Sequence, residues 1–270
     1  MRDLLEAVAA GDLSPVQAEA KLRAVTELRS YIQGPGGRFD AAREPRSGVP
    51  EGILADGKEP DETASLFVTS VETTGRAIVT RTDDETADAC RRELSETVPE
   101  ATVERNGRAR TLVAYAPSYQ PPNIEATVGV VTAGTSDAAS AGEAETIARE
   151  MGASVERVDD VGVAGIARVF ERLEALREVD VLVVAAGREG ALPTVLAGLV
   201  DVPIIGLPIS SGYGHGGEGE AALSGMLQSC TALSVVNIDA GFTAGAQAGL
   251  IARAIADARG RDSTENPIDS

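Results

Sequence analysis

The chain has 270 residues, with 24 basic and 42 acidic side chains and a formal net charge of −18. Apolar residues make up 43% of it, which is enough for a sizeable hydrophobic core and excludes a wholly disordered chain. The negative charge repels polyanions at long range, so we expect no binding to nucleic acid or to an anionic membrane. The length allows one large domain or two smaller ones.

The composition also suggests an environment. Aromatic residues make up only 3%, and only two basic residues are lysines, Lys21 and Lys58. An acidic, lysine-poor chain rich in Ala, Val and Gly is typical of a halophilic protein, although a GC-rich genome that favours arginine codons is an alternative explanation. No apolar run approaches the ~20 residues that cross a bilayer, and no leader-like segment begins the chain. We therefore expect a soluble, cytoplasmic protein.

Residues 1–122 predict a small α+β domain. Ser14, Pro15 and Gln17 stand at the N-cap, N1 and N3 positions of a helix that should run to about Ile32, where a Gly/Pro cluster breaks it. The polar segment 39–58 is expected to be irregular and to contact a substrate. Other expected elements are helices at Asp3–Ala10, Pro60–Val71 and Asp83–Val98, strands at Ala77–Thr80 and Thr111–Ala116, and a linker at Pro117–Pro122. A strand over Leu66–Val71 is an alternative to the end of the second of these helices.

Residues 123–258 follow a regular pattern in which short Val, Ile and Ala runs alternate with segments of helical spacing. The runs are 126–133, 154–158, 179–186, 202–208 and 233–238, and the helical segments are 139–151, 163–177, 192–200, 220–227 and 244–258. Such alternation indicates a parallel sheet buried on both faces. We predict an α/β domain with a three-layer, doubly wound parallel sheet, followed by a flexible tail over 259–270.

In a doubly wound sheet, ligands bind beyond the carboxyl ends of the strands, so the loops there are the candidate site. After the first strand, Gly134, Thr135 and Ser136 form a candidate anion cradle at a helix N-terminus. Asp137, which follows, could be a carboxylate favoured by the helix dipole or a general base.

The later strand ends carry further candidates. Gly187 and Gly190 flank a charged pair after the third strand, in which Glu189 could cap the next helix or act chemically. A Gly-rich loop with the chain's one histidine, His215, follows the fourth strand and has the spacing neither of a Walker motif nor of a dinucleotide fingerprint. The remaining candidates are Ser210, Gly212, Tyr213 and Gly214 in that loop and Asp239 after the fifth strand.

The two cysteines, Cys90 and Cys230, are far apart in the chain and form neither a metal-ligand set nor a disulfide framework. A free cysteine is usually a small buried hydrophobe, which is our interpretation of Cys90 and the default for Cys230.

Six motifs follow one another along the chain: TAGTSD, DVGVAG, G-x-EGALP, PxSxGYG, ML-x-SC and VNID-x-GF. In this order they resemble the LarB family, the pyridinium-3,5-biscarboxylic acid mononucleotide synthases that begin assembly of the nickel-pincer cofactor. The resemblance is dense over 126–258 and reaches into the N-terminal half through Asp40, Arg43, Arg46, Glu51, Gly57-Lys58 and Thr80-Arg81. The C-terminal half is also similar, more distantly, to aminoimidazole ribonucleotide carboxylases, which implies a flavodoxin-like sheet.

The resemblance implies that nicotinic acid adenine dinucleotide is carboxylated on its pyridinium ring by carbon dioxide and hydrolysed at its pyrophosphate to release AMP. A divalent metal such as Mg²⁺ would assist hydrolysis, and no tightly bound organic cofactor is expected. The resemblance implies that the product is used in the maturation of lactate racemase-type nickel enzymes. Relatives of the C-terminal half assemble as octamers, so we expect a homo-oligomer, with the Gly/Ala-rich helix over 240–254 suited to a subunit interface or to the core.

The chemistry also follows from the substrate. A pyridinium ring cannot attack carbon dioxide until a thiolate adds to it, so the reaction requires a cysteine nucleophile and a carboxylate base. Cys230 matches the family's nucleophile position, Asp137 is the candidate base with Ser136 as its hydrogen-bonding partner, and Glu189 is a second proton carrier or a metal ligand. Lys58, Arg43 and Arg46 could contact a phosphate or the nicotinate carboxylate, although the arginines could instead pair with acidic side chains.

Two alternatives remain. An aminoimidazole ribonucleotide carboxylase or mutase would use a histidine after the second strand, where this chain has Val158 to Gly162 and no histidine. A non-catalytic nucleotide-binding module would tolerate loss of Cys230 and Asp137. The Gly-rich loop departs from the family pattern, which is smaller and less charged there, so His215 receives no family role.

Overall fold

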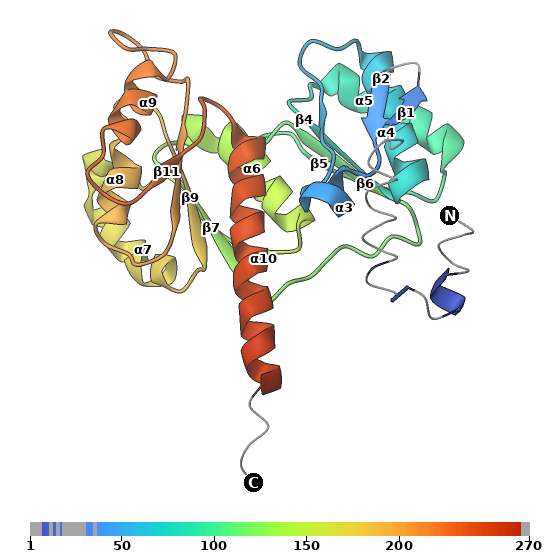
Figure 1. The fold of residues 1–270 in the computed structure, drawn as a ribbon. Coiled ribbons are helices and arrows are strands. Elements are labelled where there is room, and N and C mark those ends of the chain that lie inside the picture. Colours follow the sequence, from blue (N-terminus) through green and yellow to red (C-terminus); the bar gives the residue numbers. More distant parts are fainter. Residues whose placement is uncertain (1–6, 11–12, 15–16, 18–30, 35–36, 266–270) are drawn as a thin grey trace.

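The two larger β-sheets, one in each half of the chain, lie on either side of the helices α6 (Ala138–Glu150) and α10 (Gly241–Glu265), as Figure 1 shows. The computed structural model describes residues 7–10, 13–14, 17, 31–34 and 37–265. None of the helices in this part of the chain is long and apolar enough to cross a membrane.

The C-terminal sheet has five strands, all parallel, in the order β11-β10-β9-β7-β8. In chain order this is the 2-1-3-4-5 arrangement of flavodoxin-like folds, which confirms the predicted fold class. The apolar runs become strands because both faces of the sheet are covered. The strands are β7 (Thr127–Thr132), β8 (Ser154–Val158), β9 (Val181–Ala186), β10 (Ile204–Pro208) and β11 (Ser234–Val235).

Helices cover both faces of this sheet and so complete the three layers (Figure 1). The helices α6 and α10 place a row of alanines against one face, while Val169, Leu176, Leu192, Leu196 and Met226 pack against the other. That second group comes from α7 (Ala167–Arg177), α8 (Ala191–Ala197) and α9 (Glu220–Leu227).

Glycines let α10 lie directly on the backbone of α6. A Cβ atom at Gly241, Gly245 or Gly249 would come within 2.2, 2.3 and 2.6 Å of Ser140 O, Ala144 O and Met151 Sδ. These glycines are four residues apart and therefore line one face of the helix. The small-residue face of α10 thus belongs to the core of the chain.

The N-terminal sheet is mixed, with the order β3-β4-β6-β5 and one parallel pair, β3 with β4. One face packs on α4 and α5, whereas Ile78 and Val113 on the other face pack with Ile147 of α6, Met151 at the C-cap of α6 and Ala246 of α10. Both faces are buried, so the two halves of the chain form one packed unit. The elements are β3 (Ile53–Leu54), α4 (Pro60–Thr74), β4 (Arg76–Thr80), α5 (Asp84–Thr97), β5 (Thr102–Asn106) and β6 (Thr111–Tyr115).

Some sequence-based predictions for the N-terminal half were wrong. Ile32 belongs to a hairpin of β1 (Tyr31–Gly34) and β2 (Gly37–Asp40) and not to a helix. The segment 39–58, expected to be irregular, contains the end of β2, α3 (Arg43–Ser47) and β3. Leu66–Val71 is helical, since α4 is continuous. The edge strand β5 was missed because its sequence, TVERN, is mostly polar and half exposed.

The chain ends differ from expectation in part. The reciprocal hydrogen bonds of Ser14 and Gln17 confirm the predicted capping box, although residues 18–30 of its helix lie outside the described residues, as do Asp3–Glu6 of the first helix. At the other end, α10 continues to Glu265, so the segment 259–265 is helical and not a flexible tail. The last strand is shorter than predicted: of the run 233–238, only β11 (Ser234–Val235) is a strand.

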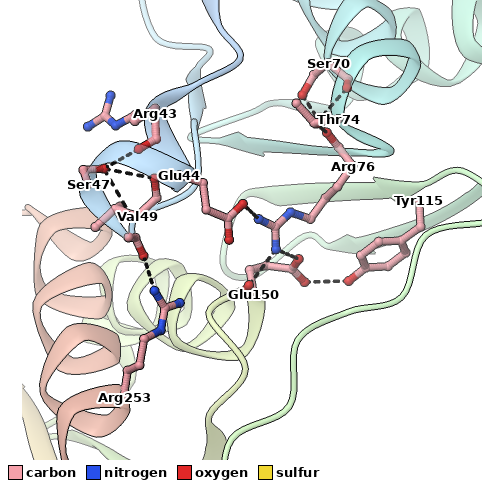
Figure 2. Close-up of polar contacts among 11 residues, drawn as sticks. Arg43, Glu44, Ser47, Val49, Ser70, Thr74, Arg76, Tyr115, Glu150 and Arg253 are labelled. Carbon is pink, nitrogen blue, oxygen red and sulfur yellow. Dashed lines mark hydrogen bonds and ion pairs between the residues drawn. The ribbon is translucent and has the colours of Figure 1, made fainter. Parts of the chain in front are cut away.

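A buried guanidinium joins the two halves (Figure 2). Arg76, at the start of β4, is 5% exposed and donates to the main-chain oxygen of Glu150 at 2.6 Å and to its carboxylate at 3.2 Å. A second nitrogen of Arg76 donates to Glu44 Oε2 at 2.6 Å, and Tyr115 donates to Glu150 Oε1 at 2.5 Å. Burial raises the pKa of Glu150, while Arg76 and Tyr115 oppose that rise.

We predict that Arg76→Met lowers the free energy of unfolding by about 3–5 kcal/mol, because it leaves the Glu150 carboxylate buried without its cation. Urea denaturation monitored by circular dichroism measures the change. Arg91→Ala is the control: its pair with Asp88 is on the surface, at 3.6 Å, and should contribute less than about 1 kcal/mol. Equal effects of the two substitutions would contradict the assigned role of Arg76.

Candidate functional site

A cavity of about 490 Å³ lies beyond the carboxyl ends of β7 and β9. The chain leaves β7 toward β8 on one side and returns to β9 on the other, so the loops after these strands separate at this point. Such a switch point is where doubly wound sheets bind ligands. The lining residues come from four segments, 133–137, 162–164, 186–192 and 211–213.

Asp137 is the buried acidic group of this cavity. It ends the single turn η1 (Thr135–Asp137) and is only 3% exposed. Its carboxylate accepts hydrogen bonds from the Gly134 N–H at 2.8 Å and from Ser136 Oγ at 3.2 Å. Burial raises the pKa of Asp137, and the hydrogen bonds from Gly134 and Ser136 partly oppose this rise. The carboxylate thus closes the turn before α6 and also lines the cavity with a raised pKa, so the structure is compatible with either interpretation from the sequence.

The opposite wall is formed by the loops after β9 and β10. Gly187 and Gly212 allow these two loops to touch. A Cβ atom on Gly187 would lie 3.0 Å from Ser211 Oγ, and a Cβ atom on Gly212 would lie 3.3 Å from the main-chain nitrogen of Arg188. The Arg188 guanidinium stacks on the exposed Tyr213 ring, 4.3 Å from its centroid. The N-cap of α8 is Gly190 and makes no side-chain capping bond, so Glu189 is not a helix cap and is exposed on the cavity wall.

A second cavity, of about 280 Å³, lies between the two domains next to the first. Ser136 and Ser211 line both cavities, and their hydroxyls are hydrogen-bonded at 3.2 Å. The N-terminal domain contributes Asp56, Ala109 and two arginines, Arg81 and Arg110. The C-terminal domain contributes Ser140, Glu143, Ser210 and Asp239 together with Ala139 and Ile209.

Asp239 organises this second cavity. Its carboxylate accepts from the Ser210 N–H at 3.1 Å and from Ser140 Oγ at 3.3 Å. Its main-chain oxygen accepts from the Arg81 guanidinium at 2.7 Å, across the domain boundary. The residue thus joins the end of β10, helix α6 and the N-terminal domain at one point.

Glu143 is a buried carboxylate in the wall of the same cavity, 3% exposed. Among the described residues, its Oε1 atom has no hydrogen-bond partner, and Arg81 Nε lies 3.8 Å away, too far for a hydrogen bond. Burial raises the pKa of Glu143, although Thr80 and Arg81 oppose the rise. A buried polar atom without a partner in the wall of a cavity indicates a place for a ligand.

Backbone strain concentrates around the two cavities. In the described chain, six residues other than glycine have a positive φ, and four of them line a cavity: Arg81 (57°), Arg110 (54°), Arg188 (52°) and Asp239 (54°). Left-handed backbone is costly for such side chains and is typical of functional sites. Five residues of these cavities were not predicted from the sequence as site residues: Arg81, Arg110, Ser140, Glu143 and Ser211. The available signal was the position of Arg81 directly after a buried strand.

The structure brings most of the predicted loop residues together. Gly134, Ser136, Asp137, Gly187, Glu189 and Tyr213 line the first cavity, and Ser136, Ser210 and Asp239 line the second. Thr135, Gly190, Gly212 and Gly214 belong to the same loops, and His215 is exposed in the Gly-rich loop.

Four predicted residues lie elsewhere. Arg43 pairs with Glu51 at 2.9 Å and Arg46 with Asp40 at 2.5 Å, as the alternative interpretation proposed. Lys58 donates to the Leu54 carbonyl at 2.6 Å. Cys230 is exposed in the segment after α9, so the default of a buried hydrophobe is wrong for it, and it lies outside the residues that line either cavity. Cys90 is buried, as expected, and burial raises its pKa to about 12.

The His, Cys, Asp and Glu side chains of the described residues do not by themselves form a metal site. No group of three or more His, Cys, Asp or Glu side chains in the described residues is arranged to hold a metal ion. Mg²⁺ in enzymes is commonly held by one or two carboxylates together with substrate phosphates, which would require the substrate to complete the site.

Each half of the chain matches the model of a known protein family. The model of the family described as AIR carboxylase matches residues 127–266, and that of the LarB/PurE-like N-terminal domain matches residues 35–115. An uncharacterized protein of Methanocaldococcus jannaschii is 38% identical over 260 residues, covering 94% of this chain and 97% of that protein. A crystal structure of a PurE2 variant from Treponema denticola aligns with 55% of this chain and all of its own, at 16% identity and a TM-score of 0.36.

We predict that the Asp137 carboxyl titrates above the usual pKa of an aspartate, because burial disfavours its charged form. The titration can be followed by ¹³C NMR of the carboxyl carbons, with Asp137→Asn to assign the signal. Ser136→Ala should raise this pKa further, since it removes a hydrogen bond to the carboxylate. A pKa at or below the usual value, or a fall in Ser136→Ala, would contradict the described environment.

Proposed function

The chain belongs to the AIR carboxylase family and carries a LarB/PurE-like N-terminal domain, and we propose that it is a pyridinium-3,5-biscarboxylic acid mononucleotide synthase. In this proposal it carboxylates the pyridinium ring of nicotinic acid adenine dinucleotide and hydrolyses the pyrophosphate, releasing AMP. The product would enter the synthesis of a nickel-pincer cofactor for enzymes of the lactate racemase type.

The observation that carries the proposal is the combination of the two matched domains in one chain. The N-terminal domain supplies Arg81 and Arg110 to a cavity that adjoins the one holding Asp137. A dinucleotide has two halves joined at a pyrophosphate, and two adjoining cavities suit it. A carboxylase of a mononucleotide would need only one of them.

The chemistry requires a thiolate and a base. Addition of the thiolate to C4 of the ring forms a C–S bond and converts the pyridinium to a neutral dienamine, whose C5 then attacks carbon dioxide. A carboxylate removes the proton from C5, and cleavage of the C–S bond expels the thiolate and restores the aromatic ring. We assign the base to Asp137, which lines the cavity and whose raised pKa makes it a stronger base than an ordinary aspartate, and the thiolate to Cys230.

Glu189, exposed on the wall of the Asp137 cavity, is proposed as a second proton carrier for the hydrolytic step. Mg²⁺ is proposed as an assisting ion held mainly through substrate phosphates, where it would neutralise the charge of the pyrophosphate. Lys58 is proposed to contact substrate only after release from the Leu54 carbonyl.

Because Cys230 is exposed and outside the cavity walls of its own chain, the proposal includes a homo-oligomer in which it enters the cavity of a second copy. Helix α9 begins after the Gly-rich loop, and Cys230 follows its far end. A cysteine that is exposed in one chain and needed at a buried ring is supplied most directly across a subunit interface.

We expect wild-type protein, incubated in high salt with nicotinic acid adenine dinucleotide, Mg²⁺ and ¹³C-bicarbonate, to form the labelled dicarboxylated mononucleotide and AMP. Cys230→Ala should form no labelled product, because no thiolate activates the ring. Cys90→Ala is the matched control and should retain activity, since Cys90 is buried with a pKa of about 12. Mass spectrometry detects both products.

Other outcomes identify other functions. AMP without label from both wild type and Cys230→Ala would make the protein a pyrophosphatase. Carboxylation of aminoimidazole ribonucleotide, with no turnover of the dinucleotide, would favour the purine enzyme instead. Tight binding of the dinucleotide without turnover would indicate a binding module.

Co-assembly of two inactive variants tests whether the site is shared. When Cys230→Ala and Asp137→Asn chains are co-expressed in equal amounts, random pairing across a symmetric interface should restore activity at about a quarter of the sites. Each variant expressed alone should stay inactive. Mixed oligomers without activity would place Cys230 and Asp137 of one chain in the same site.

A further inference from the structure

The interdomain cavity contains groups that recognise a phosphate and a hydroxyl. It is lined by the guanidinium groups of Arg81 and Arg110 and by the buried carboxylate of Glu143. Guanidinium groups are the side chains best suited to bind phosphate oxygens in pairs. The cavity exists only where the two domains meet, so neither domain alone would provide it.

The arginines are held by the main chain, which fixes their positions. Arg110 donates to the Arg81 carbonyl at 2.7 Å, and Arg81 donates to the Asp239 carbonyl at 2.7 Å. Asp56 balances both charges, at 3.7 Å from Arg81 and 3.3 Å from Arg110, and is about half exposed at the rim. A phosphate dianion can therefore replace this surface carboxylate as the partner of both guanidinium groups.

Glu143 indicates a second group that the ligand must carry, besides the phosphate. Its Oε1 atom is buried without a hydrogen-bond partner among the described residues. A hydroxyl group of the ligand would satisfy this atom, and because a hydroxyl both donates and accepts, it suits the carboxylate and the protonated acid alike. The Ser140 and Asp239 pair beside it adds further polar contacts for a sugar.

We propose that the interdomain cavity binds the adenylate half of the substrate, with its phosphate on Arg81 and Arg110 and a ribose hydroxyl on Glu143. This inference rests on the proposed function. The pyridinium ring must lie near Asp137, and the two cavities meet at the hydrogen-bonded hydroxyls of Ser136 and Ser211. The scissile pyrophosphate would therefore lie at these hydroxyls, and the second cavity would retain the leaving nucleotide.

Isothermal titration calorimetry on the full chain tests the proposal with AMP, adenosine and the 2′-deoxy and 3′-deoxy forms of AMP as probes. Wild type should bind AMP at least about tenfold more tightly than one of the deoxy forms, because that form leaves Glu143 unpaired. Glu143→Met should lose this preference while its thermal midpoint stays equal or rises, since the buried carboxyl is replaced by an apolar group of similar size.

Arg110→Ala should reduce the preference for AMP over adenosine by about tenfold or more, whereas Arg91→Ala, a surface arginine on α5, should leave it unchanged. Failure of wild type to bind AMP, equal AMP affinity in wild type and both cavity variants, or complete displacement of AMP by nicotinic acid mononucleotide would overturn the proposal.

The two proposals fail separately. If wild type forms labelled dicarboxylated product but the cavity variants bind AMP as wild type does, the subsite is wrong and the synthase function stands. If AMP binding depends on Glu143 and Arg110 but no labelled product forms, the cavity is a nucleotide site and the synthase function is wrong.

Discussion

The buried guanidinium of Arg76 holds the two domains together, and the candidate site depends on this contact. Arg76 begins β4, whose last residue is followed by Arg81, and its partner Glu150 ends α6, which begins directly after Asp137. Strand and helix therefore run side by side in opposite directions between the ion pair and the cavities. A guanidinium stays charged at any pH that proteins tolerate, so Arg76 keeps its positive charge in this ion pair throughout that range.

Small side chains make the arrangement possible. A Cβ on Gly52 would lie 2.2 Å from the Phe242 ring, and one on Gly142 would lie 2.5 Å from Ala109, so both glycines sit where the domains touch. With alanine and glycine on α6 and α10, the backbones approach closely and polar groups from distant segments come within reach. The scarcity of aromatic residues, noted first as a feature of composition, corresponds to this way of packing.

The sequence predicted the elements with strong periodicity and missed those that depend on pairing. Continuous apolar runs rich in Val identified β7 and β9 because both faces of a parallel strand are buried. The strand β5, which has a single apolar residue in its sequence TVERN, and the hairpin at Ile32 depend on a partner strand that no local pattern reveals. The C-terminal helix extends to Glu265 since no Gly/Pro cluster stops it, although its polar composition suggested a tail.

For the candidate site, loops at the strand ends were predictable, whereas the interdomain cavity was not. Asp137 and Glu189 follow strands of one sheet, and the topology of that sheet brings them together. Arg81 and Glu143 come from different domains, and only the docking of β4 on α6 places them 3.8 Å apart. Cys230 was predicted as a site residue from its motif alone, and the single chain leaves it exposed.

The packing of Ile78 and Val113 against Ala246 has a consequence for synthesis of the chain. The N-terminal sheet leaves the ribosome long before α10, yet α10 provides part of the surface that covers its second face. Until α10 emerges, this apolar face remains exposed to water and to other nascent chains. Folding of the first domain is therefore completed only by a helix that is translated after the whole second sheet.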